Sequence, residues 1–193
     1  VVGKARFAAD LNLPGQLHAA YLRSPHGHAK ILSIDTSKAE AMPGVKAIVT
    51  GDDFPALDIT DPNFDVSVNV LARGTALYNG HAIAAVAATT KAEAQAACAA
   101  IEVQYELLPV VLGIDEAMAE GAPLVNDQNY QKFVGPGDPS NIATHTPLER
   151  GVADAAWAGA DGVIEREVEW AHVPRGDSER RACGGAPGAA GPA

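Results

Sequence analysis

Three histidines and an arginine lie close together near the start of the chain and could do chemistry: His18, Arg23, His26 and His28. On a strand, the His-x-His spacing places the imidazoles of His26 and His28 on one face, which can suit zinc. A structural zinc site needs further ligands, and the sequence supplies no convincing third or fourth one. We therefore interpret both histidines as structural residues of a Ser-Pro-His turn that hydrogen-bond nearby backbone groups. A contact to another subunit is the alternative.

Two other sets of polar residues have simple structural interpretations. His81 follows Gly80 in a turn and precedes an apolar run, so we expect it to cap the edge of a strand rather than act as a base. A group of aspartates lacks the regular spacing and the closing glutamate of a calcium-binding loop, and this predicts a solvated acidic loop. Its members are Asp52, Asp53, Asp58, Asp61 and Asp65.

The two cysteines stand far apart and in no metal-binding spacing. Cys98 falls in an alanine-rich stretch, where a small buried hydrophobic residue is the expected role. Cys183 has Arg180 and Arg181 nearby, which could lower the pKa of its thiol, but no general base is assigned to it. This cysteine usage fits a reducing compartment, and we expect a cytoplasmic protein.

Composition excludes several classes of function. The chain has 193 residues, of which 47% are hydrophobic and 20% charged, and this suits a soluble domain with an appendage. Its formal net charge of −10 at pH 7, with no basic stripe, argues against nucleic-acid binding. No apolar run approaches the roughly 20 residues of a transmembrane helix, and the first residues lack the order of a secretion signal.

Short strands and short helices must position these residues. Alternating or β-branched runs predict strands over 17–23, 29–34, 45–50, 83–88 and 101–105. Capping residues and stop signals predict helices over 37–42, with Thr36 as N-cap, and over 91–100, with Thr89 or Thr90 as N-cap. Further helices are expected over 114–119 and 151–160. Because no regular βαβ repeat is present, we predict an α+β fold.

The remaining segments are predicted to be loops, one late strand and a tail. Residues 52–69 and 120–147 are expected to be loops, and 77–80 a turn. Residues 162–170 alternate in the manner of a strand. Without its normal neighbour this strand would expose an edge, so we predict marginal solubility. Residues 184–193 are of low complexity and are excluded from the fold.

Several short motifs, in one order and at consistent intervals, resemble the opening of the large, molybdopterin-binding subunits of the molybdenum hydroxylases. That family includes xanthine dehydrogenase, aldehyde oxidase and aerobic carbon monoxide dehydrogenase. The motifs are Gly-Lys-Ala-Arg-Phe-Ala-Ala-Asp (3–10), Leu-Pro-Gly-Gln-Leu-His-Ala (13–19), Arg-Ser-Pro-His-Gly-His-Ala (23–29), Met-Pro-Gly-Val (42–45), Thr-Gly-Asp-Asp (50–53), Gly-His-Ala-Ile-Ala-Ala-Val-Ala-Ala (80–88) and Val-Gln-Tyr-Glu-Leu-Leu-Pro (103–109).

The resemblance implies a domain order. Residues 1–119 would form an α/β hammerhead domain and 120–147 a linker. Residues 148–183 would be the truncated start of the molybdopterin-binding domain, followed by the tail at 184–193. Within 173–183, Val173, Gly176, Glu179, Ala182 and Cys183 match the family pattern, while the family's histidine, glutamine and proline are replaced.

The resemblance also implies an activity. The full-length protein would be a molybdenum-dependent oxidoreductase that oxidises a small carbonyl, heterocyclic or CO-type substrate, with water as the oxygen source. Its molybdenum–molybdopterin cofactor would perform the redox step, and electrons would leave through 2Fe-2S and FAD groups on partner subunits or domains. Glu179 falls on a glutamate of the family's substrate pocket. It would hydrogen-bond the substrate and stabilise charge in the transition state, and it is the one residue we predict to be catalytic.

This chain by itself is expected to bind no cofactor or metal and to be inactive, because the family's glycine-rich cofactor loops lie further along the large subunit. The alternative hypothesis is non-catalytic. In it, the chain is a stand-alone hammerhead module that serves as a scaffold or interaction domain.

Overall fold

The computed structural model describes residues 4, 10, 12–58, 61, 63–126, 140–142, 145, 146, 148, 150, 151, 157 and 159–168, except for the side chain of Asp65. By their contacts, the residues form two units. One is Gly15–Pro147, and the other combines Val1–Pro14 with Leu148–Ala193. The helices and strands named below all belong to Gly15–Pro147.

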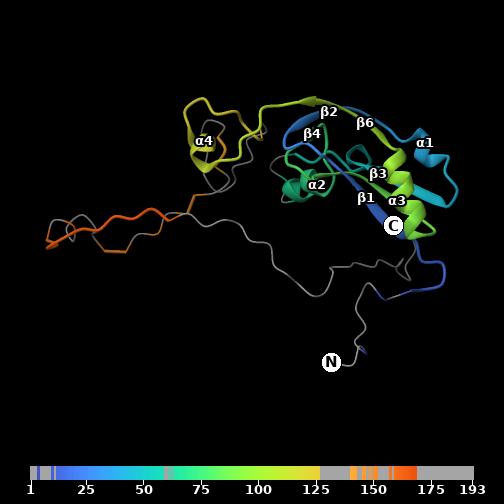
Figure 1. The fold of residues 1–193 in the computed structure, drawn as a ribbon, viewed down its shortest axis with the longest axis horizontal. Coiled ribbons are helices and arrows are strands. Elements are labelled where there is room, and N and C mark those ends of the chain that lie inside the picture. The colour runs from blue at the N-terminus through green and yellow to red at the C-terminus, as the bar shows by residue number, and fades with distance from the viewer. Residues whose placement is uncertain are drawn as a thin grey trace. The chain divides into compact units, whose positions relative to one another are not determined.

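Two three-stranded antiparallel sheets form the framework of Gly15–Pro147 (Figure 1). The first has the order β1 (His18–Arg23), β5 (Ala82–Ala88), β3 (Val45–Thr50). The second has the order β4 (Thr75–Ala76), β2 (Ala29–Asp35), β6 (Glu102–Leu107). The central strands are β5 in the first sheet and β2 in the second. Every pairing in the two sheets is between strands that are not consecutive in the chain.

Short helices lie between these strands or, in the case of α4, after the last of them. They are α1 (Ser37–Glu40), the 3-10 helix η2 (Gly51–Asp53), α2 (Phe64–Val70), α3 (Lys91–Ala100) and α4 (Ile114–Met118). The longest, α3, begins at a capping box: the Thr90 hydroxyl accepts a hydrogen bond from the Glu93 backbone N–H, and the Glu93 carboxylate accepts one from the Thr90 backbone N–H. At α1 the first free N–H, that of Ser37, is instead satisfied by the Asp35 carboxylate, at 3.0 Å.

Strand β5 is the centre of the core because both of its faces are covered. Ala84 and Val86 pack with residues of α1, of α3 and of the position directly before β6 in one cluster: Ala39, Ala97, Cys98 and Ile101. Ile83 points to the opposite face, since side chains alternate along a strand. There it packs with Ala72 and Ala76, next to partly buried residues of the second sheet: Ile31, Ile34, Val103 and Tyr105.

The α+β class is confirmed, and strands and helices are found close to most of the predicted ranges. The loop predicted at 52–69 is wrong in part, because it contains the last residues of η2 and all but the last residue of α2. Val66, Val68 and Val70 alternate with polar residues, so a helical period is not visible there. The two-residue strand β4 is not predicted either, because so short an element leaves no periodic signal.

The strand predicted at 162–170 is wrong for the described part. Residues 161–168 adopt no helix or strand. Alternation of apolar and polar residues is not enough to form a strand, since a strand also needs hydrogen-bonding partners for its backbone groups. Most of the helix predicted at 151–160, the end of the predicted strand and the tail at 184–193 lie outside the described residues. Within the described ranges, no helix is both long and apolar enough to cross a membrane.

Candidate functional site

The loop between β1 and β2, residues 24–28, carries the densest set of polar side chains that sequence analysis selected. It starts with a local turn in which the Ser24 hydroxyl accepts a hydrogen bond from the His26 backbone N–H at 3.1 Å. Pro25 fixes its own φ angle and has no N–H to donate. The side chain of Ser24 is buried. Serine and proline at these positions therefore close the turn locally, as the Ser-Pro-His interpretation predicts.

The turn before β5 holds this loop from one side. The Gly80 backbone N–H donates to Ser24 O at 2.8 Å, and the Ser24 N–H donates to His81 O at 2.8 Å. The Asn79 side-chain amide donates to Pro25 O, also at 2.8 Å. Gly80 has a φ of +89°, a value that glycine adopts without steric cost. This conformation forms the turn that brings residues 79–81 to Ser24 and Pro25.

The segment after β6 holds the loop from the other side. The buried ring of His28 lies with Nδ1 2.9 Å from Pro109 O, and the Leu108 N–H donates to His28 O at 3.0 Å. The ring of His26 packs edge-on against Tyr105, with ring centres 4.8 Å apart. The predicted structural role is confirmed for His28 through a backbone hydrogen bond. For His26 the backbone makes the hydrogen bond and the ring makes an aromatic contact.

A zinc site built from the three histidines would need His18 beside the loop, and the structure does not place it there. His18 begins β1 and pairs with Ala88, whereas the loop follows the other end of the strand. Among the described residues, no three His, Cys, Asp or Glu side chains come together in a way that could hold a metal ion.

His81 lies deeper than sequence analysis predicts. It does not sit at an exposed strand edge: its side chain is fully buried directly before β5. Its Nδ1 accepts a hydrogen bond from the Leu77 backbone N–H at 3.2 Å, and its ring stacks on Tyr78 with centres 4.5 Å apart. Its Nε2 is buried and makes no hydrogen bond. Burial lowers the pKa of His81, while the backbone at Val68 and Asn69 acts in the opposite direction.

The described aspartates of the acidic segment serve local structure and do not converge on one point. Asp53 accepts hydrogen bonds from the Thr50 N–H at 2.7 Å and from the Thr50 hydroxyl at 3.1 Å, and these bonds lower the pKa of Asp53. Asp61 accepts from the Asn63 N–H at 2.7 Å, immediately before α2. Asp52 is highly exposed, and its carboxylate lies 3.7 Å from Arg73 Nε. The prediction of a solvated acidic loop is therefore confirmed for the exposed Asp52, Asp53 and Asp58, whereas Asp61 is half-buried. The prediction of a loop is wrong where η2 and α2 form.

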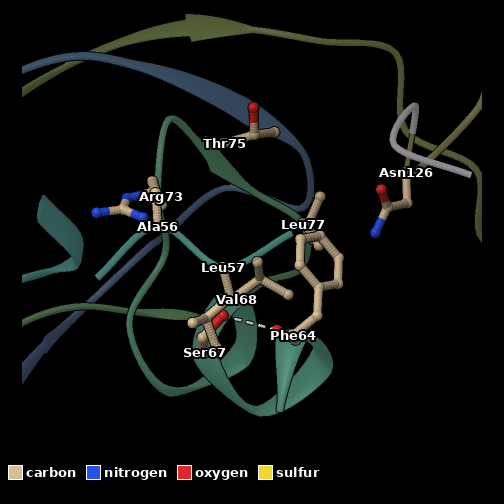
Figure 2. A pocket seen from close by; sticks show the side chains of 9 residues that line it. All are labelled: Ala56, Leu57, Phe64, Ser67, Val68, Arg73, Thr75, Leu77 and Asn126. Atoms are coloured by element: carbon tan, nitrogen blue, oxygen red, sulfur yellow. Dashed lines mark hydrogen bonds between the residues drawn. The ribbon is translucent and has the colours of Figure 1, made fainter. Parts of the chain in front are cut away.

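A pocket with a volume of about 250 Å³ lies between α2 and the segment that leads into β4 (Figure 2). Phe64, Ser67 and Val68 of α2 form one side. The other lining residues are Ala56, Leu57, Arg73, Thr75, Leu77 and Asn126. Sequence analysis misses this pocket because it assigns 52–69 to a loop. The available signal is Asn63, a helix-capping residue type directly before the apolar Phe64.

The remaining predicted residues divide between the core and the part that is not described. Cys98 is buried in the cluster under α3, and burial raises the pKa of its thiol, as expected for a packing residue. Glu179 and Cys183 lie outside the described residues, so the predicted catalytic role of Glu179 stays a prediction.

Neither the pocket beside α2 nor the loop of residues 24–28 fits a molybdopterin. The cofactor is large and carries a phosphate, whereas the pocket is at the small end for ligand sites. Its one cationic side chain, Arg73, already donates to Phe54 O at 2.6 Å and pairs with Asp52. The loop of residues 24–28 uses its polar groups to hold its own neighbours. No step of a reaction is therefore assigned to either place.

The family described as "Aldehyde oxidase and xanthine dehydrogenase, a/b hammerhead domain" matches residues 2–109 of the chain. The chain belongs to this family. Strands β1 to β6 all fall within the matched residues, so the two sheets described above are the sheets of the hammerhead domain.

Individual relatives are also similar to this chain. The carbon monoxide dehydrogenase large chain of Afipia carboxidovorans is 39% identical over 135 residues, covering 69% of this chain and 17% of that protein. A probable xanthine dehydrogenase subunit of Bacillus subtilis is 37% identical over 172 residues, covering 88% of this chain and 21% of that protein.

The comparison with solved structures supports the same family. The crystal structure of Cu,Mo-CO dehydrogenase in its carbon monoxide reduced state aligns with a TM-score of 0.55 and 36% identity, over 63% of this chain and 16% of that one. The chain thus spans only a small part, 16% to 21%, of these three relatives.

Proposed function

We propose that this chain is the N-terminal portion of the large subunit of a molybdenum hydroxylase. The observation that carries the proposal is the family match over 2–109 together with the two sheets that fill that range. The similarity to the Bacillus subtilis protein extends over 88% of the chain, which also supports a common origin beyond the hammerhead domain. The alternative of a stand-alone scaffold has no comparable observation in its favour.

The domain order proposed is a hammerhead domain at 1–119, a linker at 120–147, the start of the molybdopterin-binding domain at 148–183, and a tail at 184–193. One boundary between the two contact units falls after Pro147, which supports the end of the linker, whereas the other falls after Pro14, inside the proposed hammerhead domain. Within the linker, the Asn141 side chain accepts from the Val125 N–H at 2.9 Å and donates to Ala117 O and Pro123 O. This amide ties the two described parts of the linker to each other and to α4.

In the full-length protein, we place the chemistry outside the described residues. A molybdenum–molybdopterin cofactor would supply the redox chemistry when bound. Electrons would pass to an iron–sulfur subunit and an FAD subunit, or to equivalent domains, in the cytoplasm. Glu179 is proposed as a residue of the substrate pocket that orients a small carbonyl, heterocyclic or CO-type substrate. The hammerhead domain would act as structural support beside that centre.

The test compares two purified proteins, the 193-residue chain and the product of the uninterrupted gene expressed with its partner subunits. We expect about one molybdenum per protein and substrate-dependent dye reduction for the longer product only. The 193-residue chain should hold no stoichiometric molybdenum and show no activity. Stoichiometric molybdenum in the short chain would contradict its proposed inactivity, and a metal-free, inactive long product would contradict the proposed function itself.

A further inference from the structure

Among the described residues, His81 is a buried titratable group that the proposed function does not use. Its hydrogen-bonding state follows from geometry alone. A backbone N–H is always a donor, so Nδ1, which accepts from the Leu77 N–H at 3.2 Å, must be the unprotonated nitrogen. The neutral ring therefore carries its proton on Nε2. That nitrogen is buried without a hydrogen bond.

We propose that His81 is an acid-sensitive contact that holds the turn of residues 77–81 closed, beside the C-terminal end of α2, and that protonation of its ring opens this turn. The opening is a local change within the hammerhead domain. It does not depend on the proposed enzyme function.

The first step of the argument is what a second proton would do. Protonation must occur at Nδ1, where it would place an N–H opposite the Leu77 N–H. Two donors then face each other, and the hydrogen bond that positions the ring is lost. The cation would also be buried with no anionic side chain beside it among the described residues, and burying such a charge is costly. Rotation of the ring out of its stacked position on Tyr78 relieves both costs.

The second step is that no charged side chain among the described residues would offset the new charge. The backbone at Val68 and Asn69 favours the protonated ring, but burial outweighs it. From α2, the groups near the ring are the backbone of Val68 and Asn69. From its own turn it meets the Tyr78 ring, and the Arg23 guanidinium of β1 donates to Gly80 O at 2.8 Å. Among the described residues, no charged side chain contributes to the pKa of His81, and desolvation is the largest effect on it. The pKa of His81 is therefore lowered, in agreement with the burial of its ring.

The third step is what the contact controls. Leu77 and Val68 both line the pocket, from the turn and from α2 (Figure 2). The same turn holds the loop of residues 24–28 through Asn79 and Gly80. Loss of the His81 contact would therefore widen the pocket and loosen the loop after β1, while the sheet pairing of β5 with β1 and β3 stays in place.

The sign of the pH dependence follows from the direction of the pKa. In the opened state the ring has its ordinary pKa near 6.5, and in the closed state the pKa is lower. The opened state thus binds more protons below pH 6.5, so the closed state is fully favoured above that pH and loses stability as pH falls. For one group, the opening equilibrium changes by at most about tenfold per pH unit until the pKa of the closed state is reached.

The experiment uses the full 193-residue chain and follows the histidine ring signals by NMR from pH 8 to pH 5. It also follows amide hydrogen exchange, corrected for the intrinsic rate. We expect His81 to titrate below pH 6.5. We also expect protection of the Leu77 amide to fall by up to about tenfold per pH unit below pH 6.5, while that of Val86 in β5 changes far less. His81 titrating at or above pH 6.5, or Leu77 and Val86 changing in parallel, would overturn the proposal.

A variant separates protonation from other effects of acid. In His81→Gln the amide oxygen can accept from the Leu77 N–H, and the side chain stays neutral at every pH. The acid-dependent loss of Leu77 protection should disappear in this variant and persist in the control His18→Gln, which changes a histidine at the start of β1. Persistence in His81→Gln would overturn the proposal. If His81→Gln does not fold, the titration of the unaltered chain decides the outcome.

Discussion

Single side chains at the ends of helices fix several connections of the hammerhead domain. At the start of α3, the Glu93 carboxylate accepts from the Thr89 hydroxyl at 2.5 Å and from the Thr90 N–H at 2.9 Å. These hydrogen bonds lower the pKa of Glu93. Their contribution to stability is present above its ordinary pKa near 4.5 and is lost as pH falls through the lower pKa of the folded state.

Thr90→Ala should lower the free energy of unfolding by about 1 kcal/mol, because the free N–H of Glu93 loses the hydroxyl that accepts from it. Thr90→Ser keeps an acceptor in the same place and is the matched control. Urea unfolding at pH 7, followed by circular dichroism, measures both. Equal losses in the two variants would show that the methyl group of Thr90 matters and the hydrogen bond does not.

At the scale of elements, Phe64 is the buried side chain among the described side chains of α2. Phe64 is 7% exposed and forms a wall of the pocket, whereas Val66 on the same helix is 61% exposed (Figure 2). Phe64→Ala should destabilise the chain by about 3 kcal/mol, and Val66→Ala by less than about 0.5 kcal/mol. Denaturant midpoints of the two variants test this difference. Similar midpoints would mean that α2 is not anchored by Phe64.

Elements with a clear period or a cap can be predicted from the sequence, and elements defined by distant partners cannot. Thr90 and the alanine-rich run after it predict the helix at 91–100, and the apolar run before them predicts β5. Helix α2 escapes prediction because its valines alternate. The strand expected after Gly162 is wrong because alternation says nothing about whether a pairing partner exists.

In the candidate site, too, the local turn can be predicted from the sequence and the contacts with distant segments cannot. Serine, proline and histidine spacing predicts the turn at 24–28, because that turn closes through its own side chains. Its hydrogen bonds to Asn79 and Pro109 depend on which strands pair, and sequence spacing carries no such information. The sequence places His81 in the right turn, but its full burial follows from the packing of α2, which the sequence does not predict.

At the scale of the whole molecule, apolar side chains on the unit that contains 148–193 are left uncovered. Val163, Ile164 and Val168 are 57%, 83% and 65% exposed. Marginal solubility stays a prediction, and its basis is now this exposed apolar surface rather than an unpaired strand edge. In the proposed full-length subunit, further parts of the molybdopterin-binding domain would cover these side chains.

The double variant Ile164→Ser and Val168→Ser should reduce concentration-dependent association of the chain, since it removes two of these exposed groups. Leu32→Ser, which changes a single exposed leucine of β2, is the control and should have little effect. Light scattering across a dilution series measures the association. An unchanged profile for the double variant would show that the exposed surface at 163–168 does not cause association.

The central claim, that the chain is the opening part of a molybdenum hydroxylase large subunit, is tested most directly by the DNA sequence of its gene past the codon for Ala193. We predict an uninterrupted reading frame that continues into glycine-rich cofactor-binding segments, with residues 174–181 of the natural protein close to the family pattern around Glu179. A genuine stop codon directly after Ala193, with the sequence of 174–181 unchanged, would contradict the account. It would make the chain a hammerhead module without an enzyme of its own.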